Sequence, residues 1–320
     1  MKNFTLSDRR LLSQSLKNKV GQNKIAQIIG KSKSSVSDEI RRNSQSGNYD
    51  PEVAHVKAMQ KKLNRVKRTK LEISEGLKKY TIEKLKLEWA PEQIAGELRR
   101  LANKTIISHE VIYQFIYSEE GKKLKLWLHL RHRKKPERVH HGARKKRVLI
   151  PERISIRERP SHINLRKDFG HYEGDLMIFS NGNALAVFVE RMTRKLCAVL
   201  LPNKTAAEME LALHELISAA GQTNVKSITF DNGTENVCHV RVRAAYEYSF
   251  QTYFCDAYCS WQKGTVENTN KLLRQYLPRD IASDKLTQDF VDTVVQLLNH
   301  RPRKCLSYLT PYEKFKNCSV

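Results

Sequence analysis

The chain has 320 residues, 40% of them hydrophobic, with 58 Lys and Arg against 34 Asp and Glu. That length has room for more than one domain, and no apolar run approaches the ~18 residues of a membrane-spanning helix. The N-terminus lacks the apolar segment of a secretory signal, and all six cysteines lie in the second half. These features exclude a membrane protein and a disulfide-rich secreted protein, and they predict a cytoplasmic location.

The positive charge is concentrated in the first half of the chain. Residues 1–150 hold 36 basic and 15 acidic side chains, a surplus of 21, whereas residues 151–320 hold the remaining 22 and 19, a surplus of 3. A basic region joined to a nearly neutral one predicts a nucleic-acid-binding part followed by a part with a different role. The alternative is a basic surface that serves solubility alone.

Residues 5–43 divide into three short segments with apolar residues at helical spacing and Ser or Thr at the expected caps. In the third segment Val36 and Ile40 form the buried pair. This pattern predicts a helix-turn-helix motif whose last helix enters the major groove, with a plain three-helix bundle as the alternative. The outward face of that last helix supplies the candidate DNA contacts Lys33, Ser35, Arg41, Arg42 and Asn43.

A second, weaker helix-turn-helix motif is predicted from residues 89–100 and 108–118, which again show an apolar stripe behind a capping residue. Between the two motifs, residues 54–73 form a basic helix or linker suited to following phosphates. Residues 131–147 have no hydrophobic period and are dense in positive charge, so we expect an exposed linker that contacts the DNA backbone.

From about residue 150 the sequence changes to short apolar runs rich in strand-forming residues. Three sequential antiparallel strands are followed by helix, strand, helix, strand and a last helix that contains Glu267, which is the order of a ribonuclease-H-like α/β domain with a mixed sheet. The expected strands are 171–179, 184–191, 196–201, 225–230 and 251–255, and the expected helices between them are 204–221 and 236–248.

Three acids fall on elements that could converge. Asp175 lies inside the first strand, Asp231 closes the fourth, and Glu267 is on the last helix. A carboxylate on a central strand is costly to bury unless it is paired or metal-bound, and active sites of α/β sheets gather at strand ends. Carboxylate oxygens suit Mg²⁺ or Mn²⁺, and two such ions ~3.5–4 Å apart would promote in-line displacement at a phosphodiester.

Each acid also has a simpler interpretation. Asp231 precedes Asn-Gly, which by itself indicates a tight turn. Glu173 competes with Asp175 because it lies on the same strand face two residues earlier, and Asp256 competes with Glu267. Glu267 could instead pair with Lys271, four residues along the helix. Asn270, Lys271 and Arg274 share its helix face and become candidates for holding DNA phosphates.

Cysteine and histidine residues near Asp231 invite a zinc interpretation, but their spacing contains no tight pair of ligands. Buried free thiols are the better prediction. The residues concerned are Cys238, His239, Cys255 and Cys259.

The motifs EGDLM, TFDNGTE and YFCDAYCSWQKGTVENTNKLLRQYLPRD resemble those of the DDE transposases of bacterial insertion sequences, most closely the family numbered thirty, IS30. The resemblance also covers SSVSDEIRRN, the approach RISIRERPSHINLRKDFGHYEGD and the C-terminal signature NHRPRKCLSYLTPYEKF. It implies that Asp175, Asp231 and Glu267 are the catalytic and metal-binding acids. The 35 residues between Asp231 and Glu267 slightly exceed the usual spacing, and Cys259 stands where Ser is usual.

The resemblance further implies recognition of double-stranded element ends by the N-terminal motifs, cleavage, and strand transfer into target DNA. It implies two Mg²⁺ ions, for which Mn²⁺ substitutes, a homo-oligomer assembled on DNA, and action at the bacterial nucleoid. A DNA-binding regulator with a silent ribonuclease-H-like domain and a nuclease without strand transfer are the alternatives. The predicted division is a helix-turn-helix domain at 1–48, a basic helical linker at 49–88 and a second helix-turn-helix at 89–130. A basic linker at 131–150 and a catalytic domain at 151–320 follow.

Overall fold

The computed structural model describes the whole chain except residues 1–3, 46, 65–68, 131–148, 258 and 319–320. The chain divides into two compact units, Met1–Ile73 and Ser74–Val320. The linker expected at 131–147 lies outside the described residues. The finer five-part division stays a prediction.

The first unit is helical. It contains five helices and one short antiparallel strand pair among its described residues: α1 (Leu6–Lys17), α2 (Gln22–Ile29), α3 (Lys33–Asn43), β1 (Ser44–Gln45), β2 (Asn48–Tyr49), α4 (Pro51–Asn64) and α5 (Lys70–Ile73). Gly30 ends α2 with a φ of 66°, a left-handed conformation that glycine adopts without strain, and Ser32 caps α3 through the amide of Ser35. The turn between α2 and α3 therefore follows from these two residues.

A small core holds the three predicted helices of this unit together. Leu12, Ile25 and Val36, one from each helix, are fully buried, and Ile40 packs against them partly buried. Tyr49 and Ala54 extend the core to β2 and α4. The polar face of α3 is thereby left outward, as a recognition helix requires.

The second unit begins with another helical group. Its elements are α6 (Glu75–Lys86), α7 (Pro91–Ala102), α8 (His109–Ile116), α9 (Glu119–Lys123) and a 3-10 helix at Leu126–His129. Pro91 occupies the first turn of α7 and Ser108 caps α8 through the amide of Val111. Both expected helices of the second motif are therefore present.

Helix α7 packs against the C-terminal signature. A Cβ atom on Gly96 would lie 2.0 Å from the ring of Tyr308, so only glycine admits this contact. Around it Gln93 donates to the carbonyl of Pro302 at 2.8 Å, and Arg100 pairs with Glu313 at 3.2 Å.

The rest of the second unit is built on a five-stranded sheet with the order β5-β4-β3-β6-β7. Strands β5, β4 and β3 are antiparallel neighbours, whereas β3, β6 and β7 run parallel. The central strand β3 is therefore where the antiparallel half meets the parallel half. The strands are β3 (His171–Ile178), β4 (Ala184–Glu190), β5 (Leu196–Leu201), β6 (Ser227–Phe230) and β7 (Gln251–Phe254).

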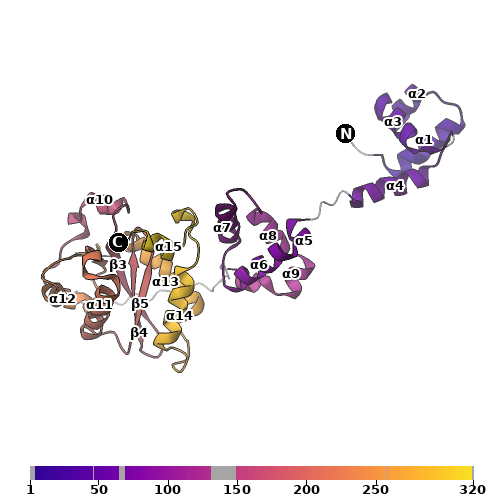
Figure 1. Cartoon of the computed structure of the whole chain (residues 1–320). Helices are drawn as coiled ribbons and strands as arrows, with labels where there is room; N and C mark the ends of the chain where they lie inside the picture. Colours follow the sequence, from indigo (N-terminus) through magenta and orange to yellow (C-terminus); the bar gives the residue numbers. More distant parts are fainter. Residues whose placement is uncertain (1–3, 46, 65–68, 131–148, 258, 319–320) are drawn as a thin grey trace. The chain divides into compact units, whose positions relative to one another are not determined.

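Helices cover both faces of this sheet, with α11 and α12 on one side and α13 and α14 on the other (Figure 1). Two separate apolar cores result, one on each face. The helices are α10 (Ser161–Asn164), α11 (Ala206–Ala220), α12 (His239–Ala245), α13 (Gly264–Tyr276), α14 (Gln288–Asn299) and α15 (Pro311–Lys316). Short 3-10 turns occupy Ile156–Glu158, Gln222–Asn224, Thr234–Cys238, Ser260–Lys263 and Lys304–Leu306.

The predicted fold class, an all-helical N-terminal region followed by a mixed-sheet α/β domain, is confirmed. One predicted element is shorter than expected: the helix at 236–248 is a 3-10 turn followed by α12, which ends at Ala245. Positive φ values at Glu247 and Tyr248 reverse the chain there before β7. No helix of the described chain is long and apolar enough to cross a membrane.

Candidate active site

Strand register brings two of the three acids together. Glu173 on β3 pairs with Thr229 on the parallel strand β6. Asp175 lies two residues further along β3, on the same pleat face as Glu173, and Asp231 directly follows the last residue of β6. Both acids thus lie at the edge where the antiparallel half of the sheet meets the parallel half.

The glycine between the two acids of β3 has a packing role. A Cβ atom on Gly174 would lie 2.6 Å from the ring of Phe230, on the sheet face opposite to Asp175. The Glu-Gly-Asp sequence therefore lets β3 and β6 approach closely while both acids point to the other face.

Lys263 joins the two aspartates. Its ammonium nitrogen lies 2.8 Å from Oδ1 of Asp175 and 3.5 Å from Oδ2 of Asp231, and it also donates to the carbonyl of Gly174 at 3.2 Å. Burial alone would lower the pKa of Lys263, but the attraction of Asp175 and Asp231 outweighs it and the pKa is raised. The lysine is therefore a charged group held at the point where both carboxylates converge.

Glu267 lies between the two residues that contact Asp175, Lys263 and Asn270, in the sequence. Lys263 precedes it by four residues and Asn270 follows it by three, and the side-chain amide of Asn270 donates to Oδ2 of Asp175 at 2.5 Å. Because residues three apart share a helix face, Glu267 lies on the face of α13 that carries Asn270, and it is half-buried. Val266, Leu273 and Leu277 face the core instead, and all three are fully buried.

Glu173 fixes the start of the helix that carries Glu267. One carboxylate oxygen accepts from the backbone amides of Thr265 and Val266 at 2.9 and 3.0 Å, and the other accepts from Nε of Arg191 at 3.0 Å. Glu173 is fully buried and its partner Arg191 is nearly so. A buried carboxylate at a helix N-terminus satisfies orphan amides and favours the helix dipole. This acid therefore positions α13 and takes no place beside Asp231.

The other residues of the Glu267 face differ in their surroundings. Within the part of the chain that the structure describes, no ion pair joins Glu267 to Lys271, and Lys271 is exposed. Arg274 donates to the carbonyl of Ile178 at 2.9 Å and stacks over the ring of Phe179. Arg274 thus ties α13 to the end of β3, whereas Lys271 extends into solvent.

Asp256 has partners of its own. It accepts from Gln262 at 3.1 Å and from Arg157 at 3.0 Å, and these two contacts lower its pKa. It closes the loop that leads to α13.

The cysteines expected to be free thiols are free. Cys238 and Cys255 are buried, Cys259 is half-buried, and none forms a disulfide. Burial raises the pKa of Cys238 and of Cys255 to about 12, so both thiols are protonated at neutral pH.

The carboxylates have the chemistry that a divalent ion needs. Two of them already converge on one cation, the ammonium of Lys263. The three acids do not all lie within 4.8 Å of one another: among the described residues, the one group of three potential ligand atoms that close is His162, Asp168 and His171 at the start of β3. The carboxylate oxygens of Asp175 and Asp231 are ligands of the kind that a divalent ion takes in proteins.

The predicted DNA contacts of α3 are divided by exposure. Lys33, Arg41 and Arg42 are exposed, and the last two lie 2.5 and 3.6 Å from Asp38. Ser35 and Asn43 are partly buried, and Ser35 is bound by the capping Ser32. Such exposed ion pairs contribute little stability, so the two arginines can leave Asp38 for a phosphate.

Sequence reasoning overlooked Lys263 and gave Glu173 the wrong alternative role. The signal for Lys263 was its position four residues before Glu267, one helical turn away. Nothing in the sequence near Glu173 indicates that it binds amides 92 residues further along.

Comparison with known proteins supplies the family. No protein-family model matches the chain. The catalytic core domain of BIV integrase, a solved structure, is 22% identical, with a TM-score of 0.39, and its match covers 47% of this chain and 95% of that one. The transposase InsI of insertion sequence element IS30A of Escherichia coli (strain K12) is 34% identical over 319 residues, covering 97% of this chain and 82% of the relative.

A second relative matches over almost its entire length. The transposase of insertion sequence element IS4351 of Bacteroides fragilis is 35% identical over 319 residues, covering 98% of this chain and 96% of the relative. Identity above 30% across nearly whole chains, with the expected fold, identifies this protein as a member of the IS30 family of transposases, a group of polynucleotidyl transferases.

Proposed function

We propose that the protein cleaves DNA at the ends of its own insertion sequence and joins the resulting 3′-hydroxyl to target DNA. The observation that carries the proposal is the pair of neighbouring carboxylates, Asp175 and Asp231, converging on one cation beside the helix of Glu267. Family membership supports the same chemistry.

The acids Asp175, Asp231 and Glu267 would hold two Mg²⁺ ions, with Mn²⁺ as a substitute. When bound, the ions activate the attacking oxygen and stabilise the leaving oxygen of an in-line displacement. Asn270 orients Asp175 through its side-chain amide, and Glu173 fixes the first turn of α13. Lys271 and Arg274 would hold the phosphates of the reacting strand.

End recognition is assigned to the first unit. The exposed Lys33, Arg41 and Arg42 of α3 would contact DNA in the major groove, with Ser35 and Asn43 at the edges of the same face. Joining two ends to one target requires that more than one copy of the chain assemble on DNA. Since the relatives are bacterial, the place of action would be the nucleoid.

The test incubates the full chain with Mg²⁺ and a duplex that carries the ends of its element, and follows release of 3′-ends. Glu267→Gln keeps the shape of the side chain and removes its charge. We expect the variant to lose about 10²–10³-fold in cleavage rate, the usual cost of removing one group that stabilises charge in an active site.

Glu215→Gln is the matched control, because Glu215 is an exposed glutamate on α11, the helix on the opposite face of the sheet. It should cleave at the wild-type rate. Equal 3′-end release by wild type and Glu267→Gln would remove Glu267 from the site. Absence of any Mg²⁺-dependent release by the wild type would overturn the proposed function itself.

A further inference from the structure

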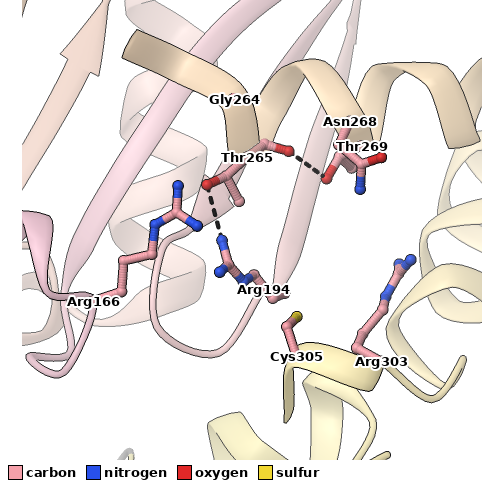
Figure 2. Close-up of a pocket in the computed structure, with 8 residues that line it drawn as sticks. All are labelled: Arg166, Arg194, Gly264, Thr265, Asn268, Thr269, Arg303 and Cys305. Atoms are coloured by element: carbon pink, nitrogen blue, oxygen red, sulfur yellow. Dashed lines mark hydrogen bonds between the residues drawn. The ribbon is translucent and has the colours of Figure 1, made fainter. Parts of the chain in front are cut away.

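A pocket of about 290 Å³ lies beside α13, close to the lower end of the ~300–1,000 Å³ range of ligand sites. Three arginines from three distant segments line it: Arg166, Arg194 and Arg303. Figure 2 shows Arg194 bound to Thr265 on the first turn of α13, and Arg303 and Asn268 extending into the space from opposite sides. Arg166 and Cys305 are exposed, so the pocket opens to solvent.

The residues that line this pocket carry positive charge. None of the eight described residues that line it is acidic. Partial desolvation, followed by the positive charge of Arg194, lowers the pKa of Arg166. The nearest buried acid, Glu173, already has both oxygens occupied by Arg191 and the amides of α13. Arg166 and Arg194 therefore repel each other, and an anion between them would relieve that repulsion.

The backbone gives a second sign that these arginines serve a ligand. Arg166 and Arg194 have φ values of 56° and 65°, in the left-handed region where glycine or asparagine is less strained. Such strain costs on the order of 1 kcal/mol or more per residue and is concentrated at binding sites. Arg166 and Arg194 therefore stand where local stability alone would favour glycine.

The pocket adjoins the helix that carries Glu267, one of the three acids of the candidate active site, which we call the acidic site (Asp175, Asp231 and Glu267). Asn268 and Thr269 line the pocket from the residues that directly follow Glu267 on α13. A helix is roughly 10–12 Å across, which is the length of about three nucleotides of one DNA strand. One DNA strand can thus reach both.

We propose that the pocket binds one phosphodiester of the DNA strand on which the acidic site acts, held by Arg166, Arg194 and Arg303. Planar guanidinium groups bind phosphate oxygens in pairs, which fixes a strand's position as well as adding affinity. The proposal rests on the proposed function for the identity of the DNA. It also gives the approach segment and the C-terminal signature, which supply Arg166 and Arg303, a direct contact with substrate.

Cys305 reports on the pocket because it lines it and is exposed. The test measures alkylation of Cys305 by iodoacetamide in the full chain, read by peptide mass spectrometry, without divalent metal. The probes are inorganic phosphate and a duplex carrying an element end, and Cys318 is the reference thiol. We expect the duplex to slow alkylation of Cys305 roughly fivefold, in line with an occupied charge-assisted phosphate contact.

The informative variant is Arg166→Gly with Arg194→Gly. Glycine fits the left-handed backbone, so the melting temperature should stay within a few degrees of wild type while protection of Cys305 falls below about twofold. Arg241→Gln, which removes an exposed arginine paired with Glu210 on the other face of the sheet, should keep full protection.

Two results would overturn the proposal. Full protection in the double variant would mean that DNA merely lies over Cys305. Protection by inorganic phosphate but not by the duplex would make the pocket a site for free phosphate. Either result with intact Mg²⁺-dependent cleavage leaves the proposed function standing, whereas protection as expected without any cleavage overturns the proposed function alone.

Discussion

Replacing Glu173 by Gln should weaken the second unit strongly, although Glu173 lies outside the acidic site. The change keeps the size of the side chain but removes the charge that faces Arg191, and the two side chains are only 0% and 5% exposed. Breaking one partner of a buried pair costs about 3–5 kcal/mol, because the other charge stays buried without compensation. Gln also has a single oxygen, which can serve the amides of α13 or Arg191 but not both.

For a unit of this size, about 2–4 °C of melting temperature is lost per kcal/mol, so the expected fall is roughly 6–20 °C. Thermal unfolding followed by circular dichroism measures it, with the exposed Glu215→Gln as the matched control, expected within about 0.5 kcal/mol of wild type. Cleavage at a temperature where the variant is folded should also be slower, because the start of α13 is less fixed. A fall of less than about 2 °C would show that Glu173 and Arg191 do not depend on each other as the structure indicates.

Three further predictions concern other charges. Lys263→Met leaves Asp175 and Asp231 without their shared cation, so the metal-free protein should melt lower and gain more stability from Mn²⁺ than wild type does; an equal or smaller gain would show that Lys263 does not occupy the metal position. Burial, followed by the charge of Lys226, lowers the pKa of His171 to about 4. Between pH 6.5 and pH 4 the histidine is therefore protonated in the unfolded state and neutral in the native state. The free energy of unfolding should therefore fall by up to about 3 kcal/mol as pH falls toward 4. Urea unfolding at pH 7.5 and 4.5 measures this fall, which should be smaller in His171→Gln than in wild type. Arg41→Gln with Arg42→Gln should reduce the slope of log affinity for an end duplex against log salt by about 1 per lost phosphate contact, and an unchanged slope would exclude both residues from the interface.

Much of the fold was accessible from the sequence because its elements are local. The apolar runs of β3, β4 and β5, the caps of α3 and α8, and the change of period near residue 150 each depend on neighbours in the chain. The pairing of Asp175 with Asp231 depends on strand register, which the sequence does not specify.

The contacts that the sequence did not disclose are long-range. Glu173 was interpreted as a rival to Asp175 because both lie on one strand face, and only the packing of α13 on β3 shows that it caps that helix. Lys263 lies 88 residues from Asp175, and the arginines of the pocket come from three segments. Tertiary packing selects among such partners, and a single sequence carries no signal for that selection.

The contact between Gly96 and Tyr308 has a consequence for how the protein can be divided in the laboratory. A fragment that begins near residue 151 would lose α7, and with it the cover over Tyr308 and the acceptor at Leu87 for Arg301, a side chain only 2% exposed. The better start for a catalytic fragment is Ser74, where the second compact unit begins. For the same reason, chimeras between relatives should exchange α7 and the C-terminal signature together, because the two segments pack against each other.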